Sequence, residues 1–161
     1  MANTQSMCTS FMGELFTGTH NFGVGVIRAA TTADVFKAAL YLATATVNAS
    51  TTAYSATNEV SGAGYTAGGI TITGSPAWVA PTATNSSATA GVAFSTPSAS
   101  FVYTTVTLAS AFDTVLVYNS TQSNKAVSVH TFGSQTITAG TFTLTMPSNT
   151  TTTALLRLAT T

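Results

Sequence analysis

Few side chains in this sequence could carry acid–base or nucleophilic chemistry. The carboxylates and histidines are Glu14, Asp34, Glu59, Asp113, His20 and His130. No two carboxylates lie close in the sequence, although a glycosidase pair could still assemble in space. The residue types of a Ser–His–acid triad are all present, but serine is so common in this sequence that their presence does not indicate a triad. No Gly-x-Ser-x-Gly motif marks a nucleophile. The sequence therefore predicts no catalytic residue and no enzyme.

Metal and cofactor sites are not predicted either. Cys8 is the only cysteine, so it can form neither an intrachain disulfide nor a multi-cysteine metal site. The two histidines lack zinc-site spacing, and His130 lies in a strand-like segment where a packed or surface histidine is expected. The glycine cluster at residues 62–69 lacks the Gly-Lys-Ser/Thr end of a Walker phosphate-binding loop and the glycine spacing of a dinucleotide-binding motif. It therefore predicts a tight turn and no nucleotide site. We expect no cofactor.

The composition is neutral and rich in hydroxyl groups. Only 5% of the 161 residues are charged, the formal net charge is zero, and serine and threonine are abundant. The cations are scattered, which argues against nucleic-acid binding; they are Arg28, Lys37, Lys125 and Arg157. A hydrophobic content of 45% argues against a disordered chain. Because few charged groups are present to keep molecules apart, self-association is favoured. We therefore expect neighbouring subunits to cover the surface.

The start of the sequence lacks the pattern of a secretory signal, and no apolar run is long enough to cross a membrane. We therefore expect no membrane partner and synthesis in the cytoplasm.

Period-two alternation of apolar and polar residues predicts an all-β fold. Residues 112–158 look like a β-meander whose strands are joined by turns, one of them the polar loop at 119–124. The whole predicts an antiparallel β-sandwich, although closure into a barrel is also open. The predicted strands are residues 34–42, 70–73, 91–94, 101–108, 115–118, 126–132, 141–146 and 155–158.

The domain organisation is expected to be an N-terminal arm at residues 1–32 and a β-sandwich domain at residues 33–161. Thr9 or Ser10 could cap a short helix over residues 11–16 within the arm, and Gly18 would stop it. Trp78 is read as a packed anchor, with a sugar-stacking platform as the alternative.

Several segments resemble a family of small virion structural proteins of tailed bacteriophages, and together they span about residues 11–159. In the front half they are DVFKAALY at 34–41, TTAY at 51–54 and NEVSGAGYTAGG at 58–69. In the back half they are VYNS at 117–120, NKAV at 124–127, FG at 132–133, AGTFT at 139–143 and ALLR at 154–157. The chain departs from the family between residues 94 and 113, where it is less acidic and less aromatic.

The resemblance implies a virion component. The member that fits the composition best is a capsid cement or decoration protein, which binds the outside of the major capsid protein shell and stabilises it against the pressure of packaged DNA. Its partners would be the major capsid protein and itself, as a dimer or trimer, and its location the capsid surface. The alternative is a tail or fibre component that binds a receptor glycan through Trp78, Tyr65 and Tyr103. An envelope hydrolase would require converging carboxylates.

Overall fold

The structure, a computed structural model, describes residues 3–8, 11, 15, 18–20, 22, 33–74, 76–84 and 91–159. The described residues form strands joined by turns and loops. The strands are β1 (Ser6–Met7), β2 (Phe36–Leu42), β3 (Ile70–Thr71), β4 (Thr82–Thr84), β5 (Val92–Ser95), β6 (Phe101–Asn119), β7 (Lys125–Leu144) and β8 (Leu156–Ala159).

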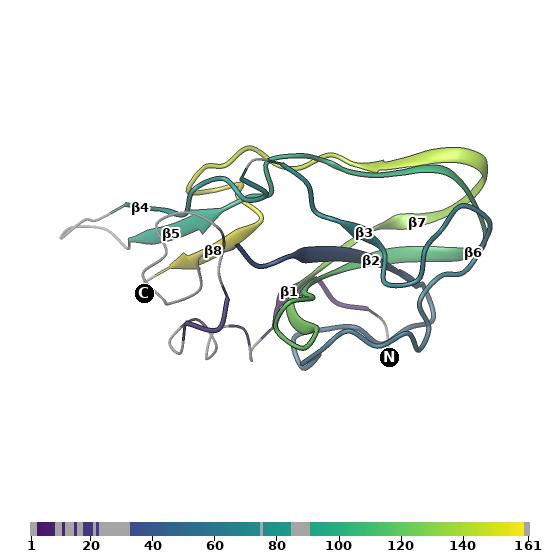
Figure 1. Cartoon of the computed structure of the whole chain (residues 1–161), viewed down its shortest axis with the longest axis horizontal. Helices are drawn as coiled ribbons and strands as arrows, with labels where there is room; N and C mark the ends of the chain where they lie inside the picture. The colour runs from purple at the N-terminus through teal and green to yellow at the C-terminus, as the bar shows by residue number, and fades with distance from the viewer. Residues whose placement is uncertain are drawn as a thin grey trace.

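Two antiparallel sheets make up the fold, which confirms the predicted all-β sandwich class. The larger sheet has the order β1-β7-β6-β2-β3 and the smaller has the order β4-β5-β8. Every pairing between these strands is antiparallel. Figure 1 shows the smaller sheet at one end of the molecule, beside the larger sheet.

A single long hairpin dominates the larger sheet. β6 has 19 residues and β7 has 20, and they pair from Asn119↔Lys125 to Phe101↔Leu144. The predicted meander of separate strands is therefore wrong, because residues 101–108 and 115–118 belong to one strand and residues 126–132 and 141–146 mostly to another. The turn predicted at residues 119–124 is confirmed, and Ser123 and Asn124 adopt the positive φ values that let the chain reverse there.

The hairpin bends back over itself. Phe142 lies opposite Tyr103 in the ladder, yet its ring centroid is 5.1 Å from that of Phe112, far along β6. The register shifts repeatedly between Tyr103 and Thr114, which is the signature of β-bulges. These bulges bend the strands so that the free ends of β6 and β7 cover the half near the turn, as Figure 1 shows.

The remaining predicted strands are confirmed in part. The strands predicted at 34–42, 70–73 and 91–94 correspond to β2, β3 and β5, although β3 is shorter than predicted. The closing strand is present as β8, but it pairs with β5 in the smaller sheet. β4 lies in a segment for which no strand was predicted.

The predicted N-terminal arm is not confirmed. β1 pairs with β7, and Cys8 and Phe11 are buried in the core. The residues predicted to form a short helix, 11–16, lie mostly outside the described part, as do residues 23–32 of the predicted arm.

Candidate functional site

The most connected polar centre of the structure is Glu59 with the tyrosines around it. Tyr54 Oη donates to Glu59 Oε2 at 2.6 Å, and Tyr65 Oη donates to Glu59 Oε1 at 2.7 Å. The backbone N–H of Gly68 also donates to Oε1, at 2.7 Å. Hydrogen bonds to a charged acceptor are among the stronger ones in proteins. Glu59 therefore ties the segment around residues 54–68 together.

The remaining tyrosines extend this centre into the sheet. Tyr118 Oη donates to the carbonyl of Gly68 at 2.8 Å, and Tyr103 Oη donates to the carbonyl of Ala38 at 2.8 Å. Tyr41 Oη donates to the carbonyl of Ser55 at 2.5 Å. All five tyrosines of the chain thus belong to one cluster, and each hydroxyl has an acceptor. We call it the tyrosine cluster: Tyr41, Tyr54, Tyr65, Tyr103 and Tyr118.

The environment of the tyrosine cluster disfavours ionisation. Burial, followed by the nearby negative charge of Glu59, raises the pKa of Tyr118 to about 12. Burial raises the pKa of Tyr41 to about 12 as well, with the Glu59 charge adding to it. The pKa values of the other three tyrosines are raised too, again chiefly by burial. These phenols stay protonated at neutral pH and act as hydrogen-bond donors, not as nucleophiles or bases.

The glycine cluster lies directly on the sheet. A Cβ atom at Gly62 would come within 1.9 Å of the Thr107 carbonyl oxygen, and one at Gly69 within 1.8 Å of the Ala38 carbonyl oxygen. Gly69 also has a φ of +72°, in the region that favours glycine. The predicted tight turn is therefore a segment whose backbone touches the backbone of β2 and β6. The glycines are required by this contact.

A second buried polar group lies at the turn between β6 and β7. Asn119 Nδ2 donates to Asp34 Oδ2 at 2.8 Å and lies 3.1 Å from His20 Nδ1. Asn119 Oδ1 accepts from the backbone N–H groups of Thr121 and Gln122, which fixes the turn. His20, Asp34 and Asn119 are all buried, so this group has a structural role.

The other candidate residues stay apart from these centres. His130 Nε2 lies 2.8 Å from Ser128 Oγ, and burial lowers the pKa of His130 to about 4. So low a pKa makes a weak base, and the Ser128 side chain is buried, out of reach of a substrate. Asp113 Oδ1 accepts from Asn3 Nδ2 and Thr114 Oγ1. Glu14 lies outside the described residues.

The part of the chain that the structure describes offers neither a cluster of metal-binding side chains nor a membrane-spanning helix. Its histidine, cysteine, aspartate and glutamate side chains form no group of three that could hold a metal ion. Nor does it contain a helix with the length and hydrophobicity needed to cross a bilayer.

The aromatic residues considered for glycan binding lie inward. Trp78 is fully buried and contacts Phe36, with ring centroids 5.5 Å apart, so it is a packed anchor. Tyr103 is buried as well, and Tyr65 is half-buried with its hydroxyl bound to Glu59. The ring of Tyr65 also stacks with that of Tyr103, with centroids 6.1 Å apart.

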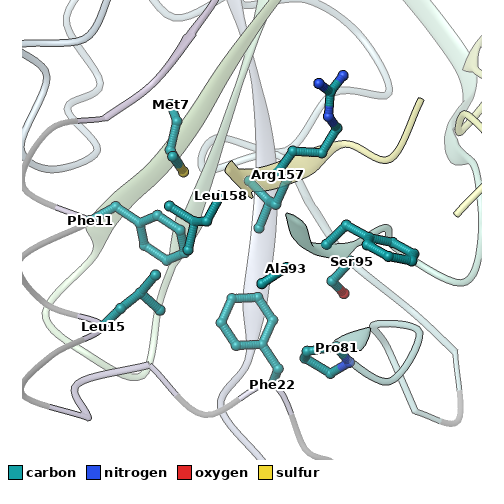
Figure 2. A pocket seen from close by; sticks show the side chains of 11 residues that line it. Met7, Phe11, Leu15, Phe22, Pro81, Ala93, Ser95, Arg157 and Leu158 are labelled. Atoms are coloured by element: carbon teal, nitrogen blue, oxygen red, sulfur yellow. The ribbon is translucent and has the colours of Figure 1, made fainter. Parts of the chain in front are cut away.

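An apolar pocket of about 140 Å³ separates the N-terminal residues from the smaller sheet. Phe11, Leu15 and Phe22 line it together with Ala93 and Leu158 of the smaller sheet (Figure 2). Arg157 directs its guanidinium away from the hollow and donates to the Thr152 carbonyl. An apolar cavity of about 150 Å³ can hold a benzene-sized group, so this pocket has room for one apolar side chain.

The exposed part of the long hairpin is uncharged. From Ala126 to Leu156 the sequence holds no Asp, Glu, Lys or Arg, and most of residues 133–145 are exposed. A neutral hollow of about 470 Å³ lies nearby, between residues 70–73 and 99–102. This surface offers hydroxyl and methyl groups of threonine, with no charge to desolvate on contact.

Comparison of the chain with protein-family models, with curated proteins and with solved structures finds no match. Sequence reasoning missed the tyrosine cluster, although the Glu59 and Tyr65 spacing within one glycine-rich segment is a signal that could have raised it.

Proposed function

We propose that this chain is a structural protein of a tailed-phage virion, and specifically a capsid cement or decoration protein that binds the outside of the major capsid protein shell. The observation that carries the proposal is the uncharged, threonine-rich surface of residues 133–145, together with the segments that resemble phage virion proteins. The protein acts without chemistry of its own. Its known carboxylate contacts fit that role, because Glu59, Asp34 and Asp113 each accept hydrogen bonds from neighbouring side chains.

A neutral hydroxyl surface suits lasting contact between subunits. Removing a charge from water costs several kcal/mol unless it is paired, whereas threonine can exchange water contacts for hydrogen bonds to a neighbour or to bridging water. Each contact is modest, but many copies repeated over a shell add up through multivalency. The combined contacts would oppose the outward pressure of packaged DNA.

Immunogold labelling of intact virions with an antibody to this chain tests the location. We expect many gold particles over the head and few over the tail. The control is the same antibody after absorption with the purified protein. Label confined to the tail would refute the capsid location and favour the tail or fibre alternative.

Heat-triggered DNA release tests the stabilising role. We expect virions that lack the protein to release DNA at a lower temperature than complete virions, and addition of the purified protein to restore the original temperature. An unchanged release temperature combined with lost adsorption to cells would contradict a cement role.

A further inference from the structure

The free edge of β7 holds a self-complementary segment. In the described part of the chain, β7 pairs with β6 along one edge, while on the other edge β1 reaches only Ser128 and Val129. Beyond that point no described strand covers the outer edge of β7. Alternate residues of an edge strand direct backbone N–H and C=O groups outward, which makes such an edge a template for another strand.

Two features limit the segment available for pairing to residues 140–146, which run two residues past the end of β7 at Leu144. At the near end, residues 137–140 of β7 oppose Leu108 and Val106 with one extra residue, and Ala139 has a φ of 47°, so a bulge interrupts the strand. At the far end Pro147 has no N–H to donate. The centre of the segment between these two limits is Thr143.

The sequence of this segment reads almost the same in both directions. Residues 141–145 are Thr-Phe-Thr-Leu-Thr. Thr141, Thr143 and Thr145 are exposed on one face, while Phe142 and Leu144 are half-buried on the other. An antiparallel copy centred on Thr143 would place threonine opposite threonine, and Phe142 opposite Leu144. Both kinds of cross-strand pair are favourable.

We propose that two copies of this chain associate edge to edge through residues 140–146, the last five residues of β7 and the two that follow it, about a two-fold axis at Thr143. The occupant of the edge is a second copy because the pattern is complementary to itself and carries no charge that the copy would repel. The pairing joins the two larger sheets into one and covers the half-buried sides of Phe142 and Leu144. The dimer specifies the self-association that the proposed function includes, and its biological setting rests on that function. The contact itself can be tested with the purified chain alone.

Cysteine cross-linking of the purified full chain tests the register. In the proposed dimer Thr143 faces its own copy, whereas Thr141 faces Thr145 and lies roughly 14 Å from its own copy along the strand. We expect Thr143→Cys to form a covalent dimer under mild oxidation at least about tenfold faster than Thr141→Cys, because a disulfide needs closely spaced Cα atoms. Both variants keep Cys8, which is buried. Equal rates, or no cross-linking of either, would overturn the proposal.

Light scattering after size exclusion tests the association itself. We expect a dimer for the natural sequence and a monomer for Thr143→Lys, which sets two positive charges against each other at the axis. Thr104→Lys is the matched control, since Thr104 is exposed on β6 but away from the free edge, and it should remain dimeric. A trimer, a natural chain that stays monomeric, or a folded Thr143→Lys dimer would contradict the inference. If Thr143→Lys does not fold, the cross-linking pair decides. Tail labelling of virions would refute the capsid location alone and leave these results standing.

Discussion

Raising the pH should unfold this protein between about pH 11 and pH 12, because the tyrosine cluster resists ionisation only in the folded state. A tyrosine in the unfolded chain has a pKa near 10. In the folded chain, burial and the Glu59 charge raise the pKa of Tyr41 and of Tyr118 to about 12 and raise that of Tyr103 as well. A raised pKa leaves stability intact below the unfolded value, and the stability is lost as the pH rises above it.

The size of the effect follows from the three most buried tyrosines, Tyr41, Tyr103 and Tyr118. Between about pH 10 and pH 12, each one that ionises in the unfolded chain alone lowers the free energy of unfolding by about 1.4 kcal/mol per pH unit. Together they remove roughly 4 kcal/mol by pH 11 and about 7 kcal/mol by pH 12. The free energy of unfolding of a typical domain is about 5–15 kcal/mol, so a loss of this size is enough to unfold the chain.

The measurement is a spectrophotometric titration of tyrosinate, followed in parallel by far-ultraviolet circular dichroism. We expect ionisation and loss of β structure to occur together, in one steep transition that reverses on return to neutral pH. Tyr118→Phe should make the free energy of unfolding fall less steeply with pH, an effect that a simple loss of stability would not produce. Gradual ionisation with a midpoint near pH 10 and an intact fold would refute the reasoning.

Three further predictions concern single residues. Glu59→Ala should lower the free energy of unfolding by about 3 kcal/mol, since three donors lose their acceptor; Asp113→Asn, which keeps an acceptor oxygen, should cost less than about 1 kcal/mol in the same urea titration. Gly69→Ala should cost about 3 kcal/mol or more, because its Cβ would meet backbone. Gly18→Ala is the control, having a similar φ of +63° but open space, and should cost about 1 kcal/mol; equal losses would show that the close contact is unimportant. Cys8 should react with a thiol reagent only after denaturant unfolds the chain, and rapid labelling of the folded protein would contradict its burial.

Local alternation predicted the strands well because it reports which residues face a core. The segments around Phe36, Val92 and Leu156 follow this pattern, and each is a strand. Alternation cannot show that residues 101–119 form one bent strand, because the bend depends on bulges that pairing with β7 creates. The pairing of β8 with β5 was missed for a similar reason, because the alternation within one strand does not indicate which strand lies beside it.

The candidate site was harder to predict than the strands. The separation of the carboxylates in the sequence could not exclude a pair in space, and the Glu59–Tyr65 spacing pointed at most to a contact within one segment, not to tyrosines gathered from several segments. Tyr54 and Tyr65 lie near it in the sequence, whereas Tyr118 reaches the cluster because β6 pairs with β2, and Tyr103 because the free end of the hairpin folds back. The tyrosine cluster therefore depends on how the strands are arranged in space, which local sequence patterns do not show.

A neutral edge that pairs with itself could in principle build fibres, so the limits of the edge matter. Pairing about a two-fold axis uses the same segment of both copies and leaves no further segment of that kind to recruit a third. The bulge at Ala139 and the proline at 147 confine the contact to residues 140–146. The outer strands of the smaller sheet, β4 and β8, have only 3 and 4 residues and are poor templates. Association should therefore stop at two copies, and the exposed threonine face of residues 133–145 stays available for the proposed contact with a capsid shell.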